Sequence, residues 1–295
     1  MNLFPLEKLK RLLFYYSYIQ DIGGSYNKNL ILKRNLTGSQ WVGKVSVSLL
    51  EKGVDFRDLN QRAFLAYRLA KLVKNKVLKP KIVPFWRISD ISLADIPKKI
   101  DNNIFLTRFR GISLSRFLNE GGKLQDIKNI NEIFDNFIFN LWIGNYDRKD
   151  SDYTVGDDKK VYFIDYHLWG PGFKKNADLS LGAYAEAYSI TDSSDTGWCI
   201  GSPNLIQFIK VQKISFDKFL PMIQRIEKLQ DSKIKQAINR FRFYDEKNED
   251  EINDTFLGFL LRRRYLLRPA IKTWIEAGYP KGHRPKDLSK KDNLY

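Results

Sequence analysis

The chain has 295 residues, of which 43% are hydrophobic and 28% charged, a composition that suits a folded protein and excludes a disordered one. Its single cysteine, Cys199, excludes a disulfide within the chain and a cysteine-based zinc site, and is typical of a reducing intracellular setting. The excess of 50 lysines and arginines over 34 acidic residues gives a net charge of +16. This charge is compatible with an anionic partner such as nucleic acid, an acidic lipid or a phosphorylated ligand, although the basic residues look spread along the chain.

The first residues predict neither a signal peptide nor a membrane-spanning helix. Glu7, Lys8 and Lys10 interrupt the apolar run that a signal peptide needs. No run of about 18 uncharged apolar residues occurs elsewhere. We therefore expect a cytoplasmic location. Residues 6–19 have the spacing of an amphipathic helix with a basic side, which we expect on the surface of the domain; contact with a membrane surface is the alternative.

The first third of the chain predicts strands and one helix. Its apolar and β-branched runs predict strands over residues 29–34, 40–48, 82–88 and 104–109. The turn-forming residues 35–39 join the first two runs into a hairpin. Apolar residues recur at helical spacing over residues 58–73, and Gly111 follows the last strand.

The rest of the chain is mainly helical. An apolar helix over residues 131–142 precedes a polar loop at 145–153 and a short apolar strand at 161–164. A stretch rich in Gly, Pro and Ser follows, and later helices are expected over residues 216–229, 232–241 and 252–274. We therefore predict an α+β protein of two lobes: a β-rich lobe at 1–111, a helical lobe at 112–280 and a flexible tail at 281–295.

Two aspartates in the second lobe suggest chemistry. Asp147 lies in the polar loop, and Asp165 ends the short strand. The turn-forming residues 156–160 predict a hairpin that folds Asp165 back towards Asp147. Phosphate transfer needs carboxylates that hold Mg²⁺ against the phosphoryl oxygens and another that orients the attacking hydroxyl and accepts its proton. Asp147 suits the second role, and Asp165, helped by Asp152, suits the first.

The residues around these aspartates resemble a signature of HipA-like and phosphatidylinositol 3/4-kinase-like proteins, which are two-lobed relatives of protein kinases that bind ATP between the lobes. The resemblance rests on Gly-Asn-Tyr-Asp-Arg at 144–148 and on Phe-Ile-Asp at 163–165. It implies that Asp147 is the catalytic-loop aspartate and that Arg148 is its neighbouring arginine. It also implies that Asp152 and Asp165 bind the metal.

The first lobe carries a further part of the resemblance, which spans roughly residues 25–270. Trp-Val-Gly-Lys-Val at 41–45 looks like the strand whose lysine contacts the α- and β-phosphates of ATP, which would make Lys44 that lysine. Ala-Tyr-Arg-Leu at 66–69 and Val-Pro at 83–84 also resemble family segments. The resemblance further implies that a hinge meets adenine through the backbone groups of Phe105, Leu106 and Thr107.

The resemblance implies an ATP- and Mg²⁺-dependent kinase that phosphorylates serine or threonine in a protein substrate, with a lipid or small-molecule hydroxyl as the alternative acceptor. Some positions depart from the family pattern. Ala63 occupies the helix position where the family has the glutamate that pairs with the lysine, and Tyr166 and His167 follow Asp165. These departures keep open a non-catalytic pseudokinase or a basic protein that binds nucleic acid or another anion.

The arginines at 262–264 and at 268 lie on a predicted helix. We expect them to be solvated or bonded to neighbouring carbonyl groups. An anion-binding patch is the alternative.

Overall fold

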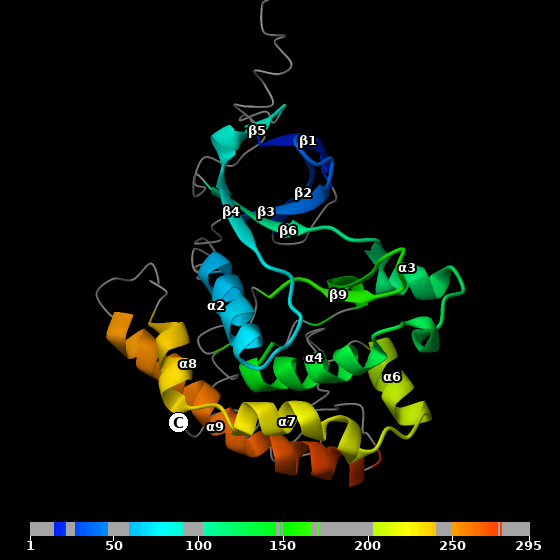
Figure 1. The fold of residues 1–295 in the computed structure, drawn as a ribbon, viewed down its shortest axis with the longest axis vertical. Helices are drawn as coiled ribbons and strands as arrows, with labels where there is room; N and C mark the ends of the chain where they lie inside the picture. Colours follow the sequence, from blue (N-terminus) through cyan, green and yellow to red (C-terminus); the bar gives the residue numbers. More distant parts are fainter. Residues whose placement is uncertain are drawn as a thin grey trace, which may run out of the picture.

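The computed structural model of the chain describes residues 15–21, 27–46, 59–90, 103–145, 148, 150–166, 170, 203–239, 249–276 and 278. Within them, Figure 1 shows a strongly curled sheet above a group of helices, and a second, smaller sheet lies among these helices. This arrangement confirms the predicted α+β class. None of the helices in these ranges combines the length and the apolar character that crossing a membrane would require.

The curled sheet has six strands in the order β4-β6-β3-β2-β1-β5. The strands are β1 (Tyr16–Asp21), β2 (Asn27–Arg34), β3 (Gln40–Ser46), β4 (Lys81–Pro84), β5 (Ile88–Ser89) and β6 (Asn103–Arg108). All neighbouring strands are antiparallel except β1 and β5, which are parallel. The predicted hairpin is confirmed, because Lys33 of β2 pairs with Gln40 of β3 across the turn at 35–39.

The inner face of this sheet has a small core of its own. It consists of Tyr16, Leu30, Leu32, Trp41, Val83, Ile88, Ile104 and Leu106. Side chains alternate along a strand, so Trp41 and Gly43 of β3 face this core. Lys44 of the same strand therefore lies on the opposite face of the sheet.

The remaining elements surround a larger core. The helices are α2 (Leu59–Leu72), α3 (Leu114–Asn119), α4 (Ile130–Ile143), α6 (Pro203–Val211), α7 (Leu220–Glu227), α8 (Asp231–Ile238) and α9 (Glu249–Glu276), and the small sheet contains β7 (Ile112–Ser113), β8 (Tyr153–Val155) and β9 (Val161–Phe163). Helix α4 lies between the small sheet and helices α7 and α9 (Figure 1). Its residues 133, 134 and 136–143 are buried, as expected of a central helix.

Helix α2 precedes β4 in the chain but packs mainly with the helices. Leu65, Leu69 and Val73 are fully buried in the larger core. Towards the curled sheet, the ring of Phe64 meets the ring of Phe105 edge to face, with 6.3 Å between the ring centres. The helix therefore joins the two parts of the molecule rather than belonging to the sheet alone.

Two sequence predictions differ from the structure. Residues 16–19 were expected in a helix but belong to β1, because they pair with β2. The strand expected at 82–88 is interrupted after Pro84 by a 3₁₀ turn at Phe85–Arg87, since proline has no N–H group to continue a ladder. Most of the Gly/Pro/Ser-rich stretch and the predicted tail at 281–295 lie outside the described residues.

Gly111 lies between β6 of the curled sheet and β7 of the small sheet, at a position where only glycine fits. Its φ is +69°, and a Cβ atom there would lie 1.8 Å from the carbonyl oxygen of Val155. Gly111→Ala is therefore expected to lower the free energy of unfolding by about 3 kcal/mol, through backbone strain and the clash together. Urea denaturation would measure this loss.

The control is Gly121→Ala. Gly121 has a φ of +90°, but a Cβ atom there would have no heavy atom within 4 Å. This variant should lose only about 1 kcal/mol, the cost of the left-handed backbone. Equal losses in the two variants would contradict the clash at Gly111.

Candidate functional site

The predicted catalytic loop begins where α4 ends. Gly144 closes the helix in a left-handed conformation, with a φ of 67°. Arg263 of α9, which is 1% exposed, donates from Nε to the carbonyl oxygens of Leu141 and Trp142, both at 3.0 Å. Both carbonyls lie in the last turn of the helix, and that of Leu141 also accepts from the N–H of the capping Gly144 at 3.2 Å. A cation at this end also suits the helix dipole. Helix α9 thus holds the C-terminal end of α4, where the loop begins.

The arginines that follow Arg263 on α9 also bond to other parts of the protein. Arg264 donates to the carbonyl oxygen of Leu229 at 2.7 Å and forms an ion pair with Asp231. Arg268 forms a two-bond ion pair with Glu227 at 2.8 and 2.5 Å. The expectation of bonds to neighbouring carbonyls is confirmed for Arg263 and Arg264. Arg263 and Arg264 are 1% and 3% exposed, so their buried guanidinium groups cannot form the alternative, a surface patch that binds anions. For Arg262 and Arg268 that alternative stays a prediction.

A row of buried amides lies beneath the loop. Asn145 Nδ2 donates to Asn140 Oδ1 at 3.3 Å, and Asn140 Nδ2 donates to Asn136 Oδ1 at 2.9 Å. Asn136 Nδ2 then donates to the hydroxyl oxygen of Tyr166, the residue after Asp165. Burial raises the pKa of Tyr166, so this phenol stays neutral. The amide row therefore joins the start of the loop to the segment that carries Asp165.

Arg148 is fully buried within the loop. Its guanidinium lies over the rings of Tyr153 and Tyr166, 4.7 and 4.8 Å from their centres. It donates to three backbone carbonyls, those of Ile164, Asp165 and Asp152, at 2.6, 3.2 and 3.4 Å. Burial alone would lower the pKa of Arg148, but interactions with Tyr166, Tyr153 and Asp152 outweigh burial and raise it. A permanently charged arginine thus ties the loop to both predicted metal ligands.

The other predicted loop residue cannot be placed in the same way. Asp147 lies outside the described residues, as do its neighbours Tyr146 and Lys149. Its predicted role stays a prediction.

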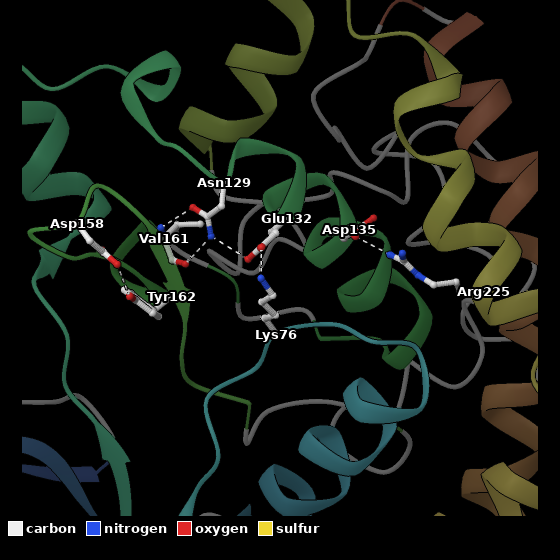
Figure 2. A network of polar contacts seen from close by, with 8 residues as sticks. All are labelled: Lys76, Asn129, Glu132, Asp135, Asp158, Val161, Tyr162 and Arg225. Atoms are coloured by element: carbon white, nitrogen blue, oxygen red, sulfur yellow. Dashed lines mark hydrogen bonds and ion pairs between the residues drawn. The ribbon is translucent and has the colours of Figure 1, made fainter.

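Strand β9, which leads to Asp165, is held against the start of α4. Figure 2 shows Asn129 between the two: its Nδ2 donates to the carbonyl oxygen of Val161 at 3.1 Å, and its Oδ1 accepts from the Val161 N–H at 2.8 Å. Glu132 accepts from Asn129 at 2.8 Å and from Lys76 at 2.5 Å. The two bonds hold Val161, the first residue of β9, against the start of α4. They therefore limit where Asp165, four residues later, can lie.

Asp165 meets Lys44 at the end of this strand. The Nζ atom of Lys44, on β3 of the curled sheet, forms a hydrogen-bonded ion pair with Oδ2 of Asp165, 121 residues away in the chain. Their side chains are 17% and 24% exposed. Asp165 also has a φ of 66°, an uncommon conformation for a residue other than glycine. A partly buried ion pair on a strained residue is typical of functional sites.

The second predicted metal ligand lies in the neighbouring segment. Asp152 is 7% exposed and ends the 3₁₀ turn Asp150–Asp152. Its carbonyl oxygen accepts from the N–H of Ile164 at 3.0 Å, which brings the backbone of Asp152 next to that of Asp165. Within the described ranges, no group of three or more His, Cys, Asp or Glu side chains could hold a metal ion. The two carboxylates are nevertheless the hard oxygen donors that Mg²⁺ prefers.

The predicted adenine hinge does not fit the sheet. Strand β6 pairs with β3 over residues 105–108 and with β4 over residues 103–106. Phe105 and Leu106 therefore lie between two paired strands, and their backbone groups are not available to adenine. Thr107 pairs only with β3, so its role stays a prediction. Residues 109–111 lie between the end of β6 and the start of β7.

Several residues of the site were not singled out from the sequence. Asn136 and Asn140 lie four residues apart within the mostly apolar run 133–143, and this spacing was a usable signal for a buried polar row. Arg263 was noted as part of a basic run, but no local signal identified its partners, which lie more than 120 residues earlier in the chain.

A comparison of the chain with models of known protein families found no match, and a comparison with curated proteins found none either.

Proposed function

We propose that the chain is a phosphotransferase that uses ATP and Mg²⁺, with a two-lobed, kinase-like arrangement of the HipA-like type. The observation that carries this proposal is the ion pair between Lys44 and Asp165. The sequence had suggested these two residues separately, one for the phosphates and one for the metal. The ammonium group of Lys44 is suited to bind phosphate oxygens, and the carboxylate of Asp165 is suited to bind Mg²⁺.

The residues of the site divide into those that would touch reactants and those that position them. Lys44 would contact the phosphates, and Asp165 with Asp152 would hold Mg²⁺, which neutralises charge on the transferred group when bound. Asp147 would orient the acceptor hydroxyl, expected on a protein serine or threonine, and accept its proton. Arg148 is a positioning residue, because its guanidinium is buried and bonded to backbone carbonyls.

The partner of Lys44 bears on whether transfer occurs. Ala63, at the position where the family has a glutamate, is buried on α2 and provides no carboxylate. Lys44 pairs with Asp165 instead. An enzyme must exchange this pair for contacts with nucleotide and metal, whereas a pseudokinase need only bind. Binding and transfer are therefore measured separately.

The test compares Lys44→Gln with Lys76→Gln. ATP should raise the melting temperature of the wild type only when Mg²⁺ is present, since a ligand that binds the native state stabilises it. Lys44→Gln should weaken ATP binding about tenfold, because it removes a charged hydrogen-bond donor from the phosphates. Lys76→Gln is the matched control, since it breaks another ion pair, between Lys76 and Glu132, on a lysine whose side chain is 74% exposed.

The same samples are then assayed for ADP release and for phosphate incorporated into protein. Transfer by the wild type and by Lys76→Gln, with loss in Lys44→Gln, is the expected result. Mg²⁺-dependent ATP binding without transfer would show a pseudokinase. The absence of any ATP-dependent stabilisation, or equal ATP affinity in both variants, would contradict the site.

A further inference from the structure

Basic and aromatic side chains collect at one end of the curled sheet. The pairs Tyr16–Arg34, Trp41–Arg108 and Tyr16–Ile88 place the starts of β1, β3 and β5 beside the ends of β2 and β6. The start of β4 joins them through the pair Lys81–Leu106. We call the cations at this end the basic rim, which consists of Arg34, Lys79, Lys81, Arg87 and Arg108.

The basic rim lies on a different part of the sheet from the candidate phosphotransfer site. Lys81, Leu106, Arg108 and Trp41 share one face, as their register shows. Lys44 is three residues beyond Trp41 and on the other face of the same strand. A ligand at the rim would therefore use residues that the phosphotransfer site does not use.

The cations of the rim lie close enough to repel one another. The Nζ atom of Lys81 lies 4.6 Å from the centre of the Trp41 ring. Burial, and then the positive charges of Arg34, Lys79 and Arg108, lower the pKa of Lys81. None of the five rim cations takes part in an ion pair within the part of the chain that the structure describes. A bound anion would relieve this repulsion.

The surrounding charge has the same sign. The described residues before Gly111 include 14 lysines and arginines but only two acidic residues, Asp21 and Asp90. Lysines and arginines occur throughout the chain, as the sequence analysis noted, but acidic residues are few among these described residues. The net positive charge is therefore concentrated in the part of the chain that forms the curled sheet and α2, where it can attract a polyanion.

Two exposed aromatic rings border the rim. The guanidinium carbon of Arg87 lies 4.3 Å from the ring centre of Tyr15 and 3.8 Å from that of Trp86. The two residues are 45% and 60% exposed. The N–H of Tyr15 donates to the carbonyl oxygen of Arg87 at 2.9 Å, which holds this group together. Exposed rings beside fixed cations are the surfaces on which unpaired bases stack.

We propose that the basic rim binds single-stranded nucleic acid, with Arg34, Lys81 and Arg108 at the phosphates and with Trp86 and Tyr15 stacked against bases. A duplex would offer its phosphates but hide the faces of its bases from these rings. A lipid surface fits less well, because the charged Arg87 lies against both rings. This inference does not depend on the proposed phosphotransferase activity.

The first measurement is fluorescence anisotropy of a labelled oligouridylate and a labelled oligothymidylate of about 20 nucleotides with the full chain. Both should bind, and the logarithm of the affinity should fall linearly with the logarithm of salt concentration. Three phosphate contacts correspond to a slope of about −2 for a single strand. A blunt duplex of the same length and vesicles of phosphatidylserine serve as competitors, and both should compete poorly.

Variants separate stacking from charge. Trp86→Ala should weaken binding about tenfold with an unchanged salt slope, because stacking carries no charge. Its matched control is Tyr265→Ala, which removes a ring that is 66% exposed and also lies against an arginine, Arg264. Arg108→Gln should reduce the slope by about 0.7. The control for this variant is Lys233→Gln, at an exposed position of α8.

Each contrary result overturns the proposal. No binding at low salt would do so, and so would Trp86→Ala binding as tightly as Tyr265→Ala. Full competition by the vesicles would assign the rim to lipid, and full competition by the duplex would show attraction to phosphates alone. Trp86 and Arg108 are exposed, so both variants should melt like the wild type. ATP binding is expected to be unchanged in both, which keeps this test separate from that of the phosphotransferase.

Discussion

Replacing Asp165 with asparagine is expected to abolish Mg²⁺-dependent ATP binding and to lower phosphate transfer by more than about a hundredfold, while the protein stays folded. The carboxylate that faces Lys44 is lost, and with it the charged oxygen that would hold the metal. Asparagine tolerates the left-handed backbone that Asp165 adopts, so the local conformation should persist.

Two further variants sharpen this result. Asp165→Ala should lose transfer equally but should also lose about 1 kcal/mol of stability relative to Asp165→Asn, because alanine tolerates the left-handed conformation poorly. Asp158→Asn, in the turn of the same hairpin, should keep full transfer. Radiolabelled phosphate incorporation and urea denaturation measure the two effects. Transfer by Asp165→Asn above about a tenth of the wild-type rate would contradict the assigned role.

Replacing Arg148 with methionine should lower the free energy of unfolding by about 3–4 kcal/mol. The change leaves the carbonyls of Asp152, Ile164 and Asp165 without this donor, and it removes the cation between Tyr153 and Tyr166. The stability of Arg148→Lys should lie between those of the wild type and Arg148→Met. Lysine keeps the positive charge, but it has no planar group that can donate to several carbonyls at once. Phosphate transfer should fall with both variants, because Asp165 loses its support.

Arg262→Met is the matched control for Arg148→Met. Arg262 lies on the exposed side of α9 and donates to the carbonyl oxygen of Gly258 within the same helix, at 3.3 Å. Its replacement should change stability by less than about 0.5 kcal/mol. Urea denaturation of the three variants provides the comparison. A loss in Arg148→Met no larger than that in Arg262→Met would show that the buried arginine does not hold the loop.

The sequence was most informative where local pattern determines structure. The apolar spacing of α4, the β-rich runs of β2 and β3 and the turn between β8 and β9 each identify their element without outside information. The same pattern predicted Asp165 at the end of this strand, whereas β9 ends at Phe163, two residues before it. Asp152 and Asp165 do lie in adjoining segments, as expected, but only the fold shows that Arg148 connects them.

Other features depend on contacts that no local pattern contains. Strand β1 forms because β2 is available to pair with it, and residues 16–19 alone look equally compatible with a helix. Arg263 looks like part of a basic run until α4 places two carbonyls against it. The predicted adenine contacts of Phe105 and Leu106 do not fit the structure, because a motif indicates neither where β6 ends nor which strands pair with it.

The packing of α2 limits how the protein can be divided. A fragment cut at residue 111 would retain this helix but lose the helices against which Leu65, Leu69 and Val73 are buried. Its exposed apolar stripe would favour aggregation, and the complementary fragment would carry a matching uncovered groove. The predicted boundary at residue 111 therefore does not separate two independently packed parts, and the curled sheet should be produced with the helical part in one polypeptide.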